Sequence, residues 1–314
     1  MADVLFTFRR LEALVNAATM AVARAGHLDE LRGGTARYLS LCGSERLTRL
    51  WPLIAPHTMN DLFRAAALLR YAEEAVALPG DLIECGVAGG GFSLLLGSLV
   101  RERGLSKTVW MCDSFAGLPA PDRKVDRLYE AGQFAYSQAA LEALVAEHGL
   151  SDICKPVPGW FADTLPALAA DRSFCLAHID GDLYASCRDA FASIYPATTP
   201  GGAIVVDDYS DGSGGALVAV HEQVARTGEV VLLGPCTQAA IQKGEHGGRR
   251  PANPGDVFKM TFDASGGPAR EGVEVSLSLA PIRADDAYIA FLSELRDHWS
   301  HRVERLSDYL ALVV

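Results

Sequence analysis

The chain has 314 residues, of which 49% are hydrophobic and 21% are charged, and its formal net charge is −11. This composition supplies a hydrophobic core and excludes an intrinsically disordered chain. The acidic balance argues against a nucleic acid or an anionic membrane as partner. No apolar run approaches the roughly 20 residues of a membrane helix, and the first residues lack the basic segment of a secretory signal. We therefore expect a soluble, cytoplasmic globular protein.

The first 80 residues are predicted to be mainly helical. Segments rich in Ala and Leu favour helices over 5–25 and 61–78, the second with Asn60 or Asp61 as its N-cap. Glycines and prolines within residues 33–56 predict a less regular stretch between these two helices.

From residue 81 onwards, short apolar runs alternate with helical windows. The runs that predict strands cover residues 81–85, 108–112, 153–157, 174–179, 203–206 and 229–233. The windows that predict helices cover residues 92–102, 138–147, 164–170, 185–195 and 216–227. Strands separated by helices predict right-handed βαβ crossovers and a largely parallel sheet, which is an α/β fold.

The C-terminal part of the chain has a different pattern. Residues 234–258 are polar and rich in Gly and Pro, and they predict a long surface loop. Residues 273–279 alternate apolar and polar side chains, as a half-buried edge strand does. Residues 285–312 carry apolar side chains at helical spacing and predict a long amphipathic helix.

A glycine-rich loop follows the first predicted strand. Residues 84–93 read Glu-Cys-Gly-Val-Ala-Gly-Gly-Gly-Phe-Ser, with four glycines in six positions before a predicted helix. Glycines allow the backbone to turn sharply and to approach a ligand closely. The spacing matches neither the dinucleotide-binding fingerprint nor the P-loop. The density of glycines predicts a nucleotide-like site, with simple turn formation as the alternative.

Acidic residues end three other predicted strands. Asp113 ends the next strand, where an acid commonly binds ribose hydroxyls, although an isolated Asp there also serves as a turn residue. Two acid pairs end later strands: Asp180 with Asp182, and Asp207 with Asp208. Because ligands of open parallel sheets bind beyond the carboxyl ends of the strands, these acids are candidates for one common site.

The four later acids predict a cation. Carboxylates gathered at two strand ends would repel one another without a positive charge between them. Hard oxygen ligands suit Mg²⁺, Mn²⁺ or Ca²⁺ better than zinc. Helix capping accounts for Asp182 or Asp208 singly but not for the cluster. His178 precedes the first pair and alternates with Asp180 along the strand, so we interpret it as structural.

Four segments together resemble the macrocin O-methyltransferase family, which includes enzymes that methylate sugar hydroxyls of macrolides. The segments are residues 84–93, 113–119, 178–186 and 207–209, and the resemblance extends from about residue 58 to residue 233. It implies the class I methyltransferase fold, a seven-stranded, mostly parallel sheet with helices on both faces. It also implies dependence on S-adenosylmethionine and Mg²⁺ (or Mn²⁺), and it favours a homo-oligomer.

The resemblance also implies the site residues. On the cofactor side it places Glu84, Gly86, Ser93, Asp113, Ser114 and Phe161, with Asp113 on the ribose hydroxyls and Ser114 and Phe161 near the adenine. It places the metal on Asp180, Asp207 and Asp208. It places the acceptor near Met59 and Tyr209. The corresponding division is an acceptor-side helical segment at 1–79, a cofactor-binding domain at 80–283 and a C-terminal helix at 284–314.

The predicted activity is methyl transfer to a hydroxyl of a small natural-product acceptor, first a sugar diol and second a phenolic diol. We expect Asp180 or Asp182 to accept the proton of that hydroxyl. The chain departs from the family's usual pattern after Tyr209, and the segments 234–258 and 285–312 are longer than expected, so the acceptor is not carried over. Two alternatives stay open: a nucleotide-sugar glycosyltransferase that uses Asp180 and Asp182 as a D-x-D motif, and a non-catalytic cofactor-binding protein.

Overall fold

A computed structural model of the chain describes residues 44–126, 128–209, 214–233 and 237–244, and the strands over 257–263, 272–278 and 282–284. The helices predicted over 5–25 and 285–312 lie outside the described residues. Among the helices that are described, none is long and apolar enough to cross a membrane.

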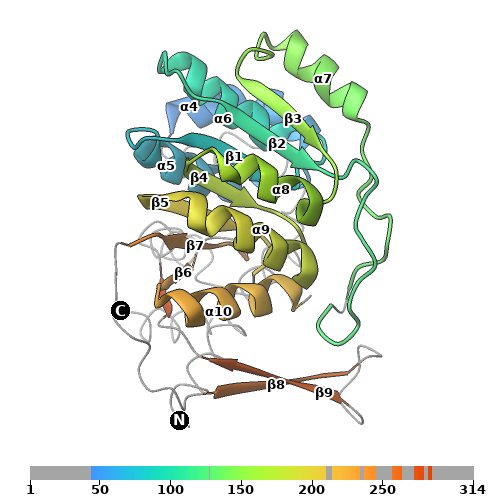
Figure 1. Cartoon of the computed structure of the whole chain (residues 1–314). Coiled ribbons are helices and arrows are strands. Elements are labelled where there is room, and N and C mark those ends of the chain that lie inside the picture. The colour runs from blue at the N-terminus through green and yellow to red at the C-terminus, as the bar shows by residue number, and fades with distance from the viewer. Residues whose placement is uncertain are drawn as a thin grey trace, which may run out of the picture.

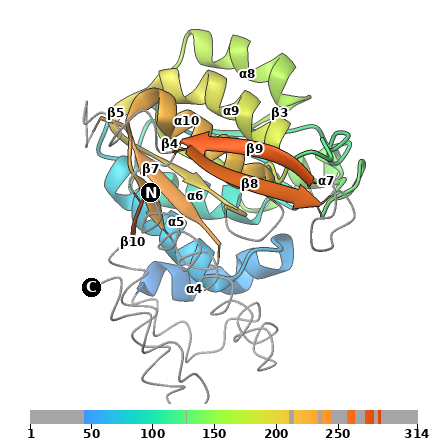
Figure 2. The ribbon, with the colours of Figure 1, turned by 90° about the horizontal axis from the view of Figure 1, so that it is seen from below.

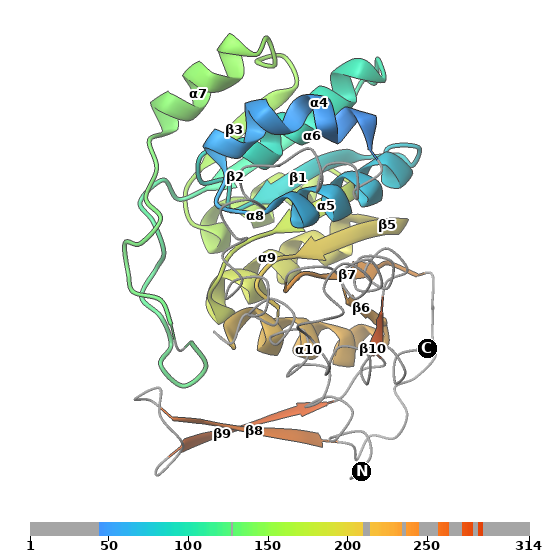
Figure 3. The same ribbon diagram turned by 180° about the vertical axis from the view of Figure 1, so that it is seen from behind.

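The centre of the fold is a mixed sheet of eight strands in the order β10-β6-β7-β5-β4-β1-β2-β3. Figure 1 labels the strands from β6 to β3, and Figure 3 labels β10 beside β6. Strand β7 runs antiparallel to β5 and β6, and the other neighbouring strands are parallel. The predicted sheet of seven mostly parallel strands is confirmed, with the short β10 added beyond β6. The strands are β1 Asp81–Cys85, β2 Val109–Asp113, β3 Cys154–Pro158, β4 Phe174–Ile179, β5 Thr198–Val206, β6 Val231–Leu233, β7 Ala239–Gln242 and β10 Ile282–Ala284.

Helices cover both faces of this sheet, as predicted. Helices α4, α5 and α6 lie on one face, and α8, α9 and α10 lie on the other (Figures 2 and 3). Helix α7 packs beside β3 at the end of the sheet. The bounds are α4 Glu45–Ile54, η1 Ala55–His57, α5 Leu62–Ala75, α6 Gly91–Glu102, α7 Gln138–Glu147, α8 Phe161–Ala170, α9 Tyr184–Ala197 and α10 Gly215–Thr227.

Helix α4 corrects the less regular structure predicted for this part of the chain. Ser44 caps it by accepting a hydrogen bond from the Leu47 amide at 3.2 Å. Its inward face, which includes Leu47 and Trp51, is fully buried against the core. A proline within a helix removes one backbone hydrogen bond. The packing of this face stabilises the helix despite Pro52.

The loop predicted over residues 234–258 is also wrong in part, because strand β7 lies within it. Ala239 and Ile241 of β7 are buried, and the strand fills the gap between β5 and β6. Strand β8 (Val257–Asp263) then pairs antiparallel with β9 (Gly272–Ser278) in a separate two-stranded sheet. The strand predicted near the end of the chain is therefore present, but it does not lie at the edge of the main sheet.

One hydrophobic core joins α4 and α5 to the sheet and to the remaining helices. Helix α5 begins where predicted, because the Asp61 carboxylate accepts hydrogen bonds from the amides of Phe63 and Arg64 at 2.8 and 3.1 Å. This cap directs the first turn of α5 towards the carboxyl ends of β4 and β5, where its Arg64 contacts Asp207 and Asp208. The division of the chain at residues 79/80 and 283/284 stays a prediction.

Candidate active site

A cavity of about 490 Å³ lies beyond the carboxyl ends of β1, β2 and β4. It brings together most of the residues predicted for the site. Those that line it are Met59, Glu84, Gly86, Asp113, Ser114, Phe161, Asp180, Asp182 and Asp208. Three others, Ser93, Asp207 and Tyr209, are buried behind the wall.

Asp113 shapes the glycine-rich loop. One oxygen of its carboxylate accepts hydrogen bonds from the amides of Val87 and Ala88 at 2.8 and 3.1 Å. The other oxygen accepts from the Phe115 amide at 2.8 Å. The carboxylate thus joins the loop after β1 to the turn after β2, and it also lines the cavity.

Gly86 brings the loop into direct contact with the acid-bearing end of β4. Its φ is +94°, in the left-handed region that favours glycine. A Cβ atom there would lie 1.8 Å from the Asp180 carbonyl oxygen. The Asp180 amide donates to the Cys85 carbonyl at 2.8 Å, so the two strand ends are held together. Only glycine fits this position.

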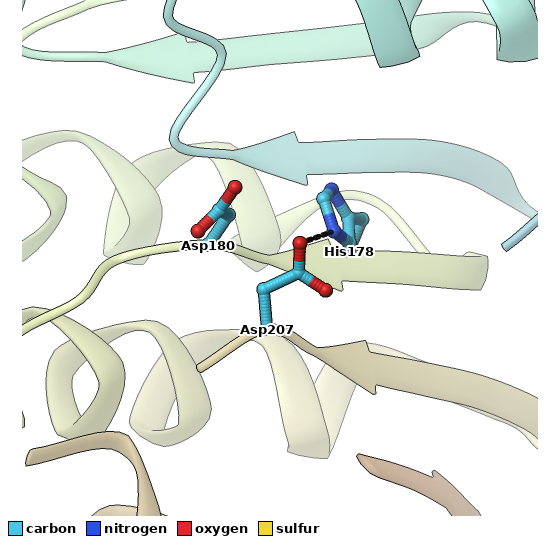
Figure 4. Close-up of side chains that lie close together, drawn as sticks. All are labelled: His178, Asp180 and Asp207. Atoms are coloured by element: carbon cyan, nitrogen blue, oxygen red, sulfur yellow. Dashed lines mark ion pairs between the residues drawn. The ribbon is translucent and has the colours of Figure 1, made fainter. Parts of the chain in front are cut away.

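A buried line of polar side chains runs behind the cavity from the loop to the acids. Ser93 donates a hydrogen bond to Glu84, and the other oxygen of Glu84 lies 3.3 Å from His178 Nδ1. His178 Nε2 lies 3.4 Å from an oxygen of Asp207, and Figure 4 marks this ion pair. Burial alone would lower the pKa of His178, but these two carboxylates outweigh it and raise the pKa well above its ordinary value. This placement agrees with a structural role for His178.

The acids form the cluster that the sequence predicts. Side-chain oxygens of Asp180, Asp182 and Asp208 lie within 4.8 Å of one another, and Asp180 forms a second such group with His178 and Asp207. Burial and the charges of Asp207 and Asp208 hold the pKa of Asp180 well above its usual range. These closely spaced hard oxygen donors fit a divalent cation such as Mg²⁺ or Mn²⁺.

The backbone at the cluster is strained. Asp182 and Asp208 both have a positive φ, at +55° and +57°. Such conformations cost roughly 1–3 kcal/mol in non-glycine residues and gather at functional sites. Ala88 and Phe134, which also line the cavity, share this feature at +46° and +60°. The strain therefore points to the same cavity as the motifs.

Arg64 is the main site residue that sequence reasoning missed. Its Nη1 donates to Asn60 at 2.7 Å and lies 3.4 Å from Asp207, while its Nη2 donates to Asp208 at 3.1 Å. Burial would raise the pKa of Asp207, but Arg64 and His178 outweigh it and lower the pKa. One signal was available, because Arg64 lies at helical spacing from the buried Leu68 on α5.

An apolar wall also lines the cavity, and it was mostly missed in the sequence. Met59 and Trp160 line the cavity with 46% and 41% of their surface exposed. Tyr129 and Phe134 come from the long connection between β2 and α7, and their rings meet edge to face at 5.7 Å. The exposure of Met59 suits the acceptor contact predicted for it.

Tyr209 lies apart from this wall. Its side chain is 3% exposed, and its hydroxyl lies 2.9 Å from His221 Nε2. It therefore does not line the cavity described here, although it immediately follows Asp208 in the chain.

Residues 40–226 match the macrocin O-methyltransferase family, TylF. The chain belongs to this family. The chain is similar to an 8-demethyl-8-(2,3-dimethoxy-alpha-L-rhamnosyl)-tetracenomycin-C 4'-O-methyltransferase of Streptomyces olivaceus, which is 38% identical over 58% of this chain and 72% of the relative. The mycinamicin III 3''-O-methyltransferase of Micromonospora griseorubida is 32% identical over 57% of this chain and 74% of its own length.

Two solved methyltransferase structures have a similar fold. The O-methyltransferase NovP is 29% identical, with a TM-score of 0.52 over 60% of this chain and 82% of NovP. The calicheamicin methyltransferase CalS11 is 19% identical, with a TM-score of 0.54 over 70% of this chain and 91% of CalS11, and it supports the fold alone. The protein is an O-methyltransferase of the macrocin family, which sets aside both the glycosyltransferase and the non-catalytic alternatives.

Proposed function

We propose that this O-methyltransferase transfers the methyl group of S-adenosylmethionine to a hydroxyl of a glycosylated natural product, with the help of a divalent cation. The single observation that carries the proposal is the continuous cavity between the glycine-rich loop with Asp113 and the cluster of acids. Two relatives named for rhamnosyl-tetracenomycin and mycinamicin support the class of acceptor. Within that class we propose a sugar diol.

The cofactor would occupy the end of the cavity formed by the glycine-rich loop. The whole cavity measures about 490 Å³, which falls within the range of roughly 300–1,000 Å³ found for small-molecule sites. Glu84 and Gly86 would line the methionine side, Asp113 would accept hydrogen bonds from the ribose, and Ser114 and Phe161 would lie near the adenine. Ser93 would act through its hydrogen bond to Glu84.

Asp180, Asp207 and Asp208 would hold the cation, Mg²⁺ or Mn²⁺. Two close groups support this assignment: Asp180 lies near Asp208 and Asp182 in one, and near Asp207 and His178 in the other. Carboxylate oxygens of this kind suit a hard divalent cation. When bound by these residues, the cation would help to position the acceptor hydroxyl and would lower its pKa. Met59 and the aromatic wall would hold the rest of the acceptor.

The chain's own task is alignment and proton removal. The bond from sulfur to the methyl carbon breaks as the bond from the acceptor oxygen to that carbon forms, and the sulfur keeps the electron pair. The proton of the hydroxyl passes to a carboxylate oxygen of Asp180 or Asp182, both of which line the cavity. Alignment of the two reactants can supply about 7–11 kcal/mol of the barrier.

Calorimetric titration of S-adenosylhomocysteine into metal-free protein, repeated with Mg²⁺, tests the cofactor. Micromolar binding, about 8 kcal/mol, is the expected result, and the absence of binding in both conditions would contradict the proposal. Asp180→Asn should bind S-adenosylhomocysteine normally and lose turnover on glycosylated acceptors. Near-normal turnover in this variant would contradict both roles assigned to Asp180.

The roles of Asp180 and Asp182 can be distinguished experimentally. If Asp182 is the proton acceptor alone, Asp182→Asn should retain Mn²⁺ binding and lose turnover, whereas Asp180→Asn should lose both. A homo-oligomeric state and a cytoplasmic location remain predictions, and size-exclusion chromatography with light scattering tests the first.

A further inference from the structure

Arg64 places a permanent positive charge inside the cluster of acids. Its guanidinium contacts two of the three predicted metal ligands, at 3.4 Å from Asp207 and 3.1 Å from Asp208. An arginine side chain does not lose its proton in proteins, so this charge is present in every state of the site.

Asn60 extends this contact to the third predicted ligand. Its side-chain oxygen accepts a hydrogen bond from Arg64 at 2.7 Å, and its side-chain nitrogen donates to Asp180 at 3.1 Å. Asn60 and Arg64 both line the cavity. The pair from the start of α5 therefore bridges the ends of both acid-bearing strands.

The structure also fixes the position of the guanidinium. Nη2 donates a hydrogen bond to Thr237 beside β7, and Nε lies 3.8 Å from the Asp61 carboxylate that caps α5. Only 14% of the side chain is exposed. Arg64 is thus held on several sides, unlike a surface arginine that samples many rotamers.

We propose that Arg64 is a resident counter-cation that stabilises the acid cluster when no divalent cation is bound and, for the same reason, weakens the binding of that cation. The proposal rests on the cation site of the proposed function. Without Arg64, the clustered carboxylates would keep His178 beside Asp207 but lose the guanidinium that contacts both Asp207 and Asp208, which destabilises the folded protein. With Arg64, an incoming divalent cation meets a like charge, which lowers its affinity.

Two substitutions separate charge from geometry. Arg64→Gln removes the charge and keeps a hydrogen-bond donor, whereas Arg64→Lys keeps the charge and loses the planar fork. Arg70→Gln is the matched control, because Arg70 lies on the same helix but stacks over the Tyr71 ring at 4.5 Å and pairs with Glu74 at 3.9 Å. The affinity for Mn²⁺ is measured from the free-ion signal in electron paramagnetic resonance, and Tm is measured in EDTA and in Mn²⁺.

We expect Arg64→Gln to bind Mn²⁺ at least about tenfold more tightly than the wild type. Its Tm should fall in EDTA and recover with Mn²⁺. Arg64→Lys should stay within about threefold of the wild-type affinity because the charge is kept, and Arg70→Gln should match the wild type in Mn²⁺ affinity.

Unchanged or weaker Mn²⁺ binding by Arg64→Gln, beside a wild type that binds Mn²⁺, would overturn the role of Arg64 alone. Absence of Mn²⁺ binding by both proteins would overturn the cation site and this inference together. If Arg64→Gln does not fold even with Mn²⁺, Arg64→Lys decides. A wild-type affinity of Arg64→Lys for Mn²⁺ supports the role of Arg64 as a counter-cation. A loss of affinity of about tenfold or more would show that the planar guanidinium orients the acids, and it would refute the proposal.

Discussion

Replacement of Gly86 by alanine tests the contact between the glycine-rich loop and the cluster of acids. The new Cβ atom would lie 1.8 Å from the Asp180 carbonyl oxygen, far inside the van der Waals distance. Neither backbone can move aside easily, because the Asp180 amide bonds to Cys85 and the Gly86 amide bonds to Cys112, at 2.8 and 2.9 Å. Relief of the clash therefore requires the ends of β1 and β4 to separate.

The expected loss of stability combines two contributions. The left-handed backbone costs an alanine roughly 1–2 kcal/mol, and forced overpacking typically costs about 1–3 kcal/mol more. Gly86→Ala should therefore lower the free energy of unfolding by about 2–5 kcal/mol, a large share of the roughly 5–15 kcal/mol of a typical domain. Gly104→Ala is the control, because Gly104 also has a positive φ, +61°, but has no atom within 4 Å of its Cβ position.

Urea unfolding of both variants, followed by circular dichroism, measures the difference. Gly104→Ala should show the backbone cost alone, and Gly86→Ala should lose at least about 1 kcal/mol more. Gly86→Ala should also bind S-adenosylhomocysteine and Mn²⁺ more weakly, since the contact joins both ends of the cavity. Equal losses of stability in the two variants would refute the claim that a Cβ atom at Gly86 collides with the Asp180 carbonyl oxygen.

Two further predictions concern charged groups. Asp113→Asn should weaken S-adenosylhomocysteine binding by about ten- to a hundredfold in calorimetry, because an amide cannot accept all three backbone hydrogen bonds and the loss costs about 1–3 kcal/mol. Burial raises the pKa of Glu102, but hydrogen bonds from Arg46 and Arg49 outweigh it and lower the pKa. A group whose pKa is lower in the folded than in the unfolded protein stabilises the fold at any pH above its unfolded pKa. This stabilisation disappears as the pH falls through the folded pKa. Glu102→Gln should therefore lose up to about 1 kcal/mol of stability at neutral pH, and this difference should shrink as the pH falls below the ordinary pKa of a glutamate, measured by urea unfolding.

The parts of the site that could be predicted from the sequence are those carried by local motifs. The glycine-rich loop, Asp113 and the acids after β4 and β5 each follow an apolar strand directly, so the spacing along the chain reveals their place at the sheet edge. Strand β7 could not be found in the same way. Its residues, Ala239–Gln242, have little strand preference of their own, and burial between β5 and β6 provides the stability.

Contacts that form only in the folded protein explain the remaining gaps. Arg64 is 143 residues from Asp207 along the chain, and no local motif links the two residues. The apolar wall has the same origin, because Tyr129 and Phe134 lie in the connection between β2 and α7 and reach the cavity only in the folded protein. The charged position on the buried face of α5 was the one usable signal, since a buried arginine requires acidic partners.

The register of the sheet fixes how the glycine-rich loop and the acids lie relative to each other, which the motifs alone do not. Glu84 on β1 is the register partner of His178 on β4, and the backbone amide of Asp207 bonds to Ile179 at 2.9 Å. A shift of β4 by one residue would turn His178 to the opposite face of the sheet and bring an apolar side chain between Glu84 and Asp207. The buried carboxylates of Glu84 and Asp207 would then lose His178 as their common partner. Two unpaired buried charges would destabilise the shifted register. The packing that selects the register therefore also places the acids of the site.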